Sequence, residues 1–178
     1  WTQLRASVPV RAGILAIDDT GFPKQGTDSV GVQRQYCGAL GKIGNCQVAV
    51  SLSLANRQAS LPIAYRLYLP QDWATDHERR CKVGVPADIG FATKPEIALR
   101  QIAAACKADL PRGVVLMDAG YGCNTQLRAG ISALALCYVA GIMPHTSVWA
   151  SGREPLPPKA KAWLTACRTR ARTGPTRR

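Results

Sequence analysis

The sequence contains no long apolar run, no closely paired cysteines and few acidic residues. The longest apolar stretch, from Ala133 to Met143, includes Gly141 and is far shorter than the roughly 20 residues that a membrane-spanning helix needs. No charged leader followed by an apolar stretch and a small-residue cleavage site is visible. We therefore expect a protein that neither crosses a membrane nor carries a secretory signal.

The seven cysteines form no C-x-x-C pair, and their spacing fits no zinc site. Most of them, for example Cys46, Cys106 and Cys137, lie within apolar runs, where a thiol behaves as a small buried hydrophobe. Free, buried thiols indicate a reducing compartment. We predict a cytoplasmic protein.

The shortage of acids leaves a large basic surplus, because 11 Asp and Glu residues stand against 23 Lys and Arg residues and the net charge is +12. Such a surplus indicates a polyanionic partner. It is unevenly distributed: eight basic residues and one acid give residues 151–178 a charge of +7, which leaves +5 for residues 1–150. We predict one folded domain over residues 1–150, followed by a Pro- and Arg-rich basic tail over 151–178 that is disordered or read in a shifted frame.

Hydrophobic periodicity predicts a mixed α/β sheet. The expected order is strand, hairpin, helix, strand, helix, strand. Thr93 and Glu96 form a capping box at the start of the first helix, whose inner face should carry Ile97, Ile102 and Cys106. The predicted elements are strands at 14–17, 114–117 and 136–142, a hairpin at 46–54 and 61–69, a loop-rich insertion at 70–92, a helix at 93–110 and a helix capped by Asn124.

Two aspartates, Asp18 and Asp118, each follow an apolar strand and precede glycine-bearing turns. The carboxyl ends of strands in α/β sheets collect functional groups, and two neighbouring carboxylates repel each other unless a cation lies between them. A hard divalent metal such as Mg²⁺ fits this pattern. The alternatives are that these aspartates only form turns, or that Asp19-Thr20-Gly21 is an aspartic protease signature, which a capped helix between two strands fits badly.

Several longer segments together resemble the DDE-type transposases of bacterial insertion sequences. The similarity runs in order over about residues 10–158, so it is more specific than any single motif. The segments are 17–24, 29–32, 35–38, 41–42, 45–48, 66–70 with Trp73, 93–96 and 118–122.

The resemblance implies a ribonuclease H-like fold, in which three acidic residues hold two divalent ions, Mg²⁺ or Mn²⁺, for cutting and rejoining DNA. Asp18 matches the first acid and Asp118 the second, while Asp19 could replace Asp18 as the metal ligand. The implied partners are the DNA of the element's ends and target, and further copies of the chain in a transposition complex. The implied location is the bacterial nucleoid.

The third acid of the family, a Glu on a late helix, has no counterpart in this sequence. Glu154 lies among prolines, and the similarity stops at about Lys159. We therefore expect a C-terminally truncated transposase that is inactive alone. The alternative is a non-catalytic DNA-binding remnant or a non-functional pseudogene product.

The segment after Asp18 is rich in turn residues and contains three basic side chains. Lys24, Arg34 and Lys42 could contact DNA phosphates, or could be solvated surface residues. Tyr121 and His145 are assigned no catalytic role.

Overall fold

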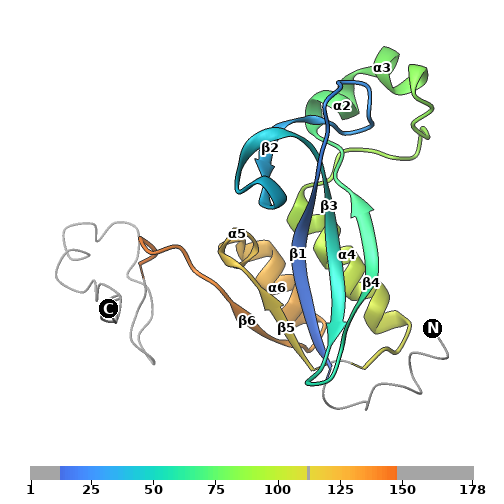
Figure 1. Ribbon diagram of the computed structural model, residues 1–178. Coiled ribbons are helices and arrows are strands. Elements are labelled where there is room, and N and C mark those ends of the chain that lie inside the picture. Colours follow the sequence, from blue (N-terminus) through green and yellow to red (C-terminus); the bar gives the residue numbers. More distant parts are fainter. Residues whose placement is uncertain (1–12, 112, 148–178) are drawn as a thin grey trace, which may run out of the picture. The chain divides into compact units, whose positions relative to one another are not determined.

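The computed structural model describes residues 13–111 and 113–147 of the chain (Figure 1). The chain divides into one unit over Trp1–Gly141 and a second over Ile142–Arg178. All helices and strands described below belong to the first unit. In the second, the amide of Thr146 donates a hydrogen bond to the carbonyl of Met143. The predicted tail at 151–178 lies outside the described residues.

A six-stranded mixed sheet forms the centre of the first unit, with the order β2-β3-β1-β5-β6 and with β4 paired to β3. Strands β1 to β4 pair antiparallel, whereas the β1–β5 and β5–β6 pairs are parallel. The strands are β1 (Ile14–Pro23), β2 (Gln33–Cys37), β3 (Lys42–Ala55), β4 (Ser60–Leu67), β5 (Val114–Met117) and β6 (Cys137–Ala140).

Four of the helices, α3, α4, α5 and α6, begin at a residue whose side chain caps the helix. The Thr93 hydroxyl accepts from the amide of Glu96, and the Glu96 carboxylate accepts from the amide of Thr93, so the predicted capping box is confirmed. Asn124 likewise accepts from the amide of Leu127 at 2.7 Å. The helices are η1 (Gly38–Leu40), α2 (Gln71–Thr75), α3 (His77–Lys82), α4 (Lys94–Lys107), α5 (Ala119–Gly122) and α6 (Thr125–Ala133).

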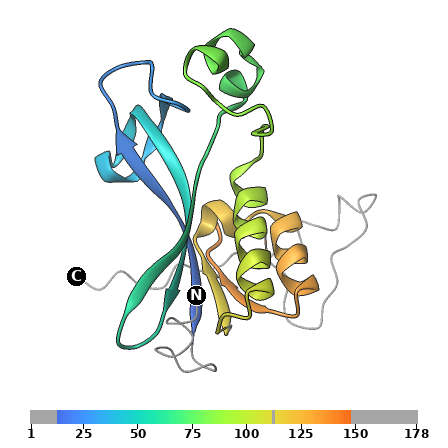
Figure 2. The ribbon, with the colours of Figure 1, turned by 90° about the vertical axis from the view of Figure 1, so that its right-hand side faces the viewer.

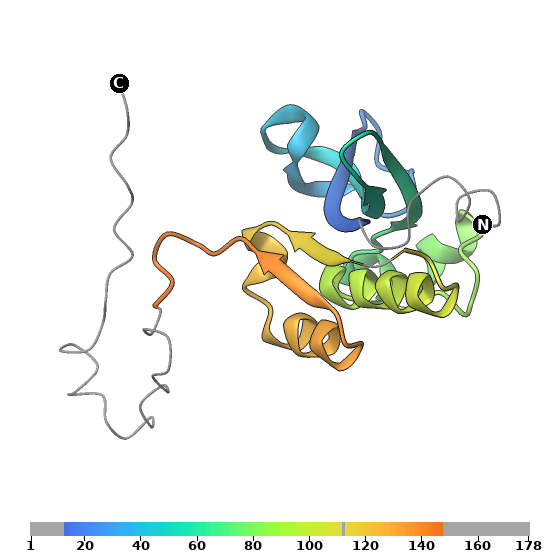
Figure 3. The ribbon, with the colours of Figure 1, turned by 90° about the horizontal axis from the view of Figure 1, so that it is seen from below.

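Helices α4 and α6 lie side by side on one face of the sheet, which we call the covered face (Figures 2 and 3). They pack the buried side chains of Ile97, Ile102 and Ile131 into one core with strand residues. The strand residues on this face include Leu15, Ile17, Leu52, Val115 and Met117. The predicted inner face of α4 is confirmed at Ile97 and Ile102, whereas Cys106 is half-buried.

The opposite side of the sheet, which we call the open face, exposes apolar side chains. Alternation along the strands, with the pairs Ala16–Leu116 and Leu116–Val139, places these residues and Ile14 together on it. Ile14 is 40% exposed, Leu116 46% and Val139 57%. Periodicity alone did not distinguish this face from the covered one.

The prediction that the first strand stops at Asp18 is wrong, because β1 continues to Pro23. All ten residues of β1 pair with β3, from Ile14 with Ala55 to Pro23 with Cys46. The Ser51 hydroxyl also donates to the backbone carbonyl of Asp18 at 2.9 Å. These long-range bonds override the local turn tendency of the Asp-Asp-Thr-Gly segment.

Two regions expected to lack regular structure contain short elements. Strand β2 lies in the segment predicted to be turns, and helices α2 and α3 lie in the predicted loop-rich insertion. The indole of Trp73 in α2 is buried and donates to the carbonyl of Val32 at 2.8 Å, which ties the insertion to the segment before β2. The other predicted elements and their order are confirmed. No helix within the described residues is long and apolar enough to span a membrane.

The prediction that most cysteines are buried is wrong for the described residues. Cys37 and Cys46 are buried, but Cys81, Cys123 and Cys137 are exposed. Cys137 lies in an apolar run, but it pairs with Val114 and so shares the open face with Leu116 and Val139, on the last strand of the sheet. Burial, together with the neighbouring Cys37, raises the pKa of the Cys46 thiol, so this thiol stays protonated and unreactive.

Candidate active site

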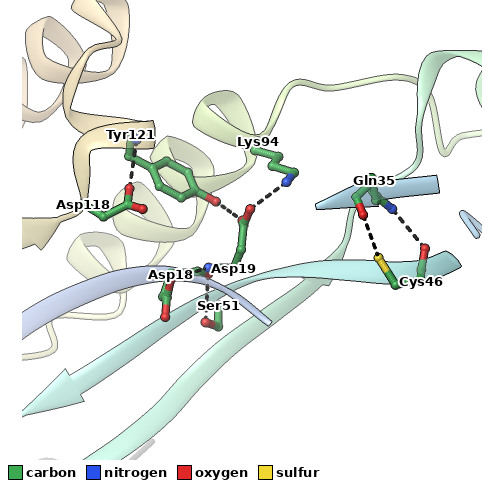
Figure 4. Close-up of polar contacts among 8 residues, drawn as sticks. All are labelled: Asp18, Asp19, Gln35, Cys46, Ser51, Lys94, Asp118 and Tyr121. Carbon is green, nitrogen blue, oxygen red and sulfur yellow. Dashed lines mark hydrogen bonds and ion pairs between the residues drawn. The ribbon is translucent and has the colours of Figure 1, made fainter. Parts of the chain in front are cut away.

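Strands β1 and β5 are parallel neighbours, which is the condition for Asp18 and Asp118 to lie close together. The last pair in their register is Ile17 with Met117, so Asp18 and Asp118 occupy the next position on each side. Both residues are exposed. Asp118 caps α5, since its Oδ1 accepts from the amide of Tyr121 at 3.1 Å (Figure 4). The sheet therefore holds two carboxylates at one end of a rigid strand pair.

Asp19 follows Asp18 in the chain but points to the opposite face of the sheet. Asp18 pairs with Ser51 on β3, and Asp19 pairs with the buried Val50 on the covered face. Asp19 Oδ1 accepts from the Tyr121 hydroxyl at 2.5 Å, and its Oδ2 forms an ion pair with Lys94 Nζ at 2.6 Å (Figure 4). Both oxygens of the Asp19 carboxylate are therefore engaged.

The Tyr121 hydroxyl lies near the negative charges of three aspartates, Asp18, Asp19 and Asp118. The residue is buried, and burial is the main cause that raises the pKa of its phenol well above the ordinary value. The hydrogen bond to Asp19 and the charges of Asp19, Asp118 and Asp18 raise it further. The phenol therefore stays protonated and acts as a hydrogen-bond donor to Asp19.

A cleft of about 270 Å³ opens beside these side chains. Its lining residues are Asp19, Lys94, Pro95, Asp118, Gly120 and Tyr121. A Cβ atom on Gly120 would lie 3.3 Å from Asp118 Oδ1, so the glycine leaves room around this carboxylate. The Lys94 ammonium also lies 5.5 Å from the centre of the Tyr68 ring, which is a cation–π contact.

Carboxylate oxygens, such as those of Asp18, Asp19 and Asp118, are the ligands that a hard divalent cation prefers, and of these three residues Asp19 and Asp118 line the cleft. Asp18 Oδ1 accepts from the amide of Asp19 at 2.8 Å, but within residues 13–111 and 113–147 no hydrogen bond or ion pair reaches Oδ2 of either Asp18 or Asp118. In this part of the chain no group of three or more His, Cys, Asp or Glu residues is placed to hold a metal ion. Two carboxylates are nevertheless enough for Mg²⁺, which commonly binds through one or two carboxylates together with substrate phosphates.

The three basic residues proposed to contact DNA do not lie beside the carboxylates. Lys24 follows β1 directly, Arg34 is in β2 and Lys42 is the first residue of β3, so the prediction of a turn-rich segment is wrong for two of them. Arg34 pairs with Asn45, six residues along β3 from Ser51. Strand geometry puts Arg34 about 20 Å from Asp18 along the sheet, at roughly 3.3 Å per residue.

Arg34 and Lys42 lie on opposite faces of the sheet. Arg34 lies on the same face as Asp18, because Asn45 and Ser51 have the same alternation along β3. Lys42 pairs with the buried Cys37 and has the opposite alternation. Both side chains are exposed, whereas Lys24 is half-buried.

Two residues of the site, Lys94 and Tyr121, were not predicted from the sequence. Lys94 lies within the segment 93–96 and Tyr121 within 118–122, and both segments belong to the family resemblance. Their contacts with Asp19 join positions 75 and 102 residues apart, which no local pattern shows. The described His145 is exposed and belongs to the second unit.

Comparison with known proteins identifies a transposase as a relative of this chain. A probable transposase for insertion sequence element IS701 from Microchaete diplosiphon is 34% identical over 109 residues, which cover 61% of this chain and 26% of the relative. The chain thus spans about a quarter of the length of the curated relative it matches. No solved structure matches the chain.

A family model described as DDE superfamily endonuclease matches residues 1–176. The mixed sheet with its helices is consistent with the ribonuclease H-like fold of such endonucleases. The chain therefore belongs to the DDE superfamily of endonucleases.

Proposed function

We propose that this chain is part of a transposase that cuts and rejoins the DNA of an insertion sequence, with Asp118 and Asp18 as metal ligands and with Asp19, which lines the cleft beside Asp118, as the alternative to Asp18. The observation that carries the proposal is the pair of exposed carboxylates at adjacent positions of two parallel strands, each with a free Oδ2 within the described residues. Two further facts support it. The DDE endonuclease family generally depends on divalent metal ions, and the IS701 relative is named as a probable transposase.

The contribution of this chain is to hold the carboxylates in place. When bound, a pair of divalent metal ions in such a site activates the attacking oxygen and stabilises the leaving oxygen of a phosphoryl transfer. Asp18 is held by its strand, whose backbone bonds to β3 extend on both sides of it. Asp118 is oriented by the amide of Tyr121, which leaves its second oxygen available. Mg²⁺ and Mn²⁺ both suit this set of oxygen ligands.

Lys24, Arg34 and Lys42 are proposed to bind DNA phosphates away from the cutting site. At about 3.4 Å per base pair, the roughly 20 Å between Arg34 and Asp18 corresponds to about six base pairs of duplex. Such contacts position DNA without reading its sequence.

We further propose that the chain alone performs little or no strand transfer. In the proposed assignment the resemblance supplies two of the three acids, and within the described residues no group of three or more His, Cys, Asp or Glu residues is placed to hold a metal ion. Glu154 lies outside these residues. Loss of a ligand weakens at least one metal position, and each tenfold loss of rate corresponds to about 1.4 kcal/mol of activation free energy.

Binding of Mn²⁺, followed by electron paramagnetic resonance on the full chain, tests the metal ligands directly. We expect Asp18→Asn and Asp118→Asn each to weaken Mn²⁺ binding by about tenfold or more, since each removes one charged ligand. The control is Asp88→Asn, which removes an equal charge from an exposed loop position. If both site variants bind Mn²⁺ as the wild type does, the proposed metal site is wrong.

A joining assay with DNA from the ends of the element tests the expected inactivity. The full chain is incubated with this DNA and Mg²⁺ or Mn²⁺, and we expect no efficient joining. Efficient joining that disappears in Asp118→Ala would overturn the proposed inactivity while supporting the metal chemistry. DNA binding in a chain that binds no Mn²⁺ would instead support the non-catalytic DNA-binding remnant.

A further inference from the structure

We propose that Gly141 is a positioning residue for Asp118. Because Gly141 has no side chain, the end of β6 packs directly against α5, the single helical turn that Asp118 caps. The proposal rests on the proposed function, since it concerns Asp118 as a metal ligand. It applies equally whether Asp18 or Asp19 is the ligand on β1.

The backbone of Gly141 lies against the peptide bond that follows Asp118. Gly141 comes immediately after β6, and its amide donates to the carbonyl of Met117 at 2.9 Å. A Cβ atom on Gly141 would lie 2.7 Å from the amide nitrogen of Ala119 and 3.0 Å from the carbonyl carbon of Asp118. A Cβ atom does not approach a backbone nitrogen this closely, so a side chain here would displace the peptide that joins Asp118 to α5.

The other end of α5 contacts the same glycine. A Cβ atom on Gly122, the last residue of α5, would clash with the carbonyl oxygen of Gly141 and would lie 3.0 Å from the Cβ atom of Ala140. The amide of Gly122 donates to the carbonyl of Asp118 at 2.7 Å, which closes the turn. Gly141 therefore faces both ends of α5, and the position of this turn depends on the space that the glycine leaves.

Space, and not backbone conformation, requires glycine at this position. The glycines with a positive φ among the described residues are Gly31, Gly41 and Gly84, so the backbone of Gly141 does not lie in the left-handed region. Alanine could adopt the same backbone angles. The atoms that its Cβ would meet belong to the backbone around Asp118 rather than to a flexible side chain, so the backbone must shift.

A shift of α5 changes the geometry of the cleft. The amide of Tyr121 holds Asp118 Oδ1, so the carboxylate moves together with the turn. The Tyr121 hydroxyl, on the same turn, donates to Asp19 on the neighbouring strand. Mg²⁺ demands near-ideal octahedral coordination, whereas Ca²⁺ accepts flexible geometries. Displacement of Asp118 should therefore weaken the binding of Mg²⁺ more than that of Ca²⁺.

Metal competition on the full chain tests the proposal. Mn²⁺ binding is followed by electron paramagnetic resonance, and Mg²⁺ or Ca²⁺ is added to displace the Mn²⁺. We expect Gly141→Ala to weaken Mg²⁺ binding by about fivefold or more and Ca²⁺ binding by less than about twofold. The matched control is Gly130→Ala in α6, whose added Cβ would meet the flexible side chain of Leu99. We expect this control to leave both affinities unchanged, and a thermal melt checks that each variant is folded.

A nuclear magnetic resonance measurement on the wild-type chain does not depend on the folding of a variant. Addition of Mg²⁺ should shift the amide resonances of Ala119 and Gly141 together, because the two backbones are in contact. The amide resonance of Gly130 should stay in place. If Gly141→Ala does not fold, this measurement decides the proposal.

Two results would overturn the role of Gly141. One is a folded Gly141→Ala chain with the wild-type ratio of Mg²⁺ to Ca²⁺ affinity, and the other is a Gly141 resonance that does not respond to Mg²⁺. If Asp118→Asn loses Mn²⁺ in the same experiments, the proposed function stands and only the role of Gly141 is wrong. Wild-type Mn²⁺ binding by Asp118→Asn would instead overturn Asp118 as a metal ligand, and with it the proposed function.

Discussion

The two faces of the central strands carry similar apolar side chains in different environments. Leu15 and Val115 on the covered face are buried beneath α4 and α6, whereas Ile14 and Leu116, one residue away on the same strands, are largely exposed. The difference comes from the position of the helices and not from the composition of the strands. Apolar content therefore does not show which face of a strand belongs to the core.

The same contrast separates the two adjacent aspartates. Asp19 shares the alternation of the covered face, where it meets Lys94 and Tyr121. Asp18 shares the alternation of the open face and keeps a carboxylate oxygen free of bonds from the described residues. Two carboxylates one residue apart on the same strand therefore differ: both oxygens of Asp19 are bonded to other side chains, whereas Oδ2 of Asp18 accepts no bond from the described residues.

The largest effect should come from equal truncations on the two faces. Leu52→Ala removes a fully buried side chain from the covered face and should lower the free energy of unfolding by about 2–5 kcal/mol, through lost burial and the cavity left behind. Leu116→Ala on the open face should change it by only about 0.5 kcal/mol. Urea unfolding of both variants measures the difference. Similar losses would show that the open face is covered in solution.

A smaller effect should follow from removing one hydroxyl on each face. Tyr121→Phe leaves Asp19 Oδ1 without its donor and should lower the free energy of unfolding by about 1 kcal/mol, since this carboxylate is still partly reached by water. Tyr65→Phe makes the same chemical change at an exposed position on β4 and should be neutral. Equal values in thermal or urea unfolding would contradict the hydrogen bond to Asp19.

The smallest effect should appear at the capping box that begins α4. The amide of Thr93 and then its hydroxyl hold the pKa of Glu96 below its ordinary value of 4.5. A carboxyl whose pKa is lower in the folded chain stabilises it above pH 4.5, and this stabilisation is lost as the pH falls further. The difference in unfolding free energy between the wild type and Glu96→Gln should therefore shrink from about pH 7 to about pH 3. A constant difference over this range would contradict the capping bond.

The sequence by itself determined the elements whose causes are local. Thr93 and Glu96, three residues apart, fix the start of α4, and Asn124 fixes that of α6, because these side chains bond amides within one turn. Strand β5 and the relative order of the predicted elements followed from short-range apolar periodicity, whereas β2, α2 and α3 did not. The ordered set of matching segments also indicated the family, to which the chain does belong.

Only the tertiary structure decided the features that depend on distant partners. Strand β1 continues through the Asp-Asp-Thr-Gly segment, which favours a turn, because β3, some thirty residues away, pairs with the whole length of β1. Cys137 is exposed because it lies on the open face of the sheet, which the apolar run around it does not reveal. The different settings of Asp18 and Asp19 arise because α4 and α5 bring Lys94 and Tyr121 to one side of β1 alone, and contacts across 75 and 102 residues leave no periodic trace in the sequence.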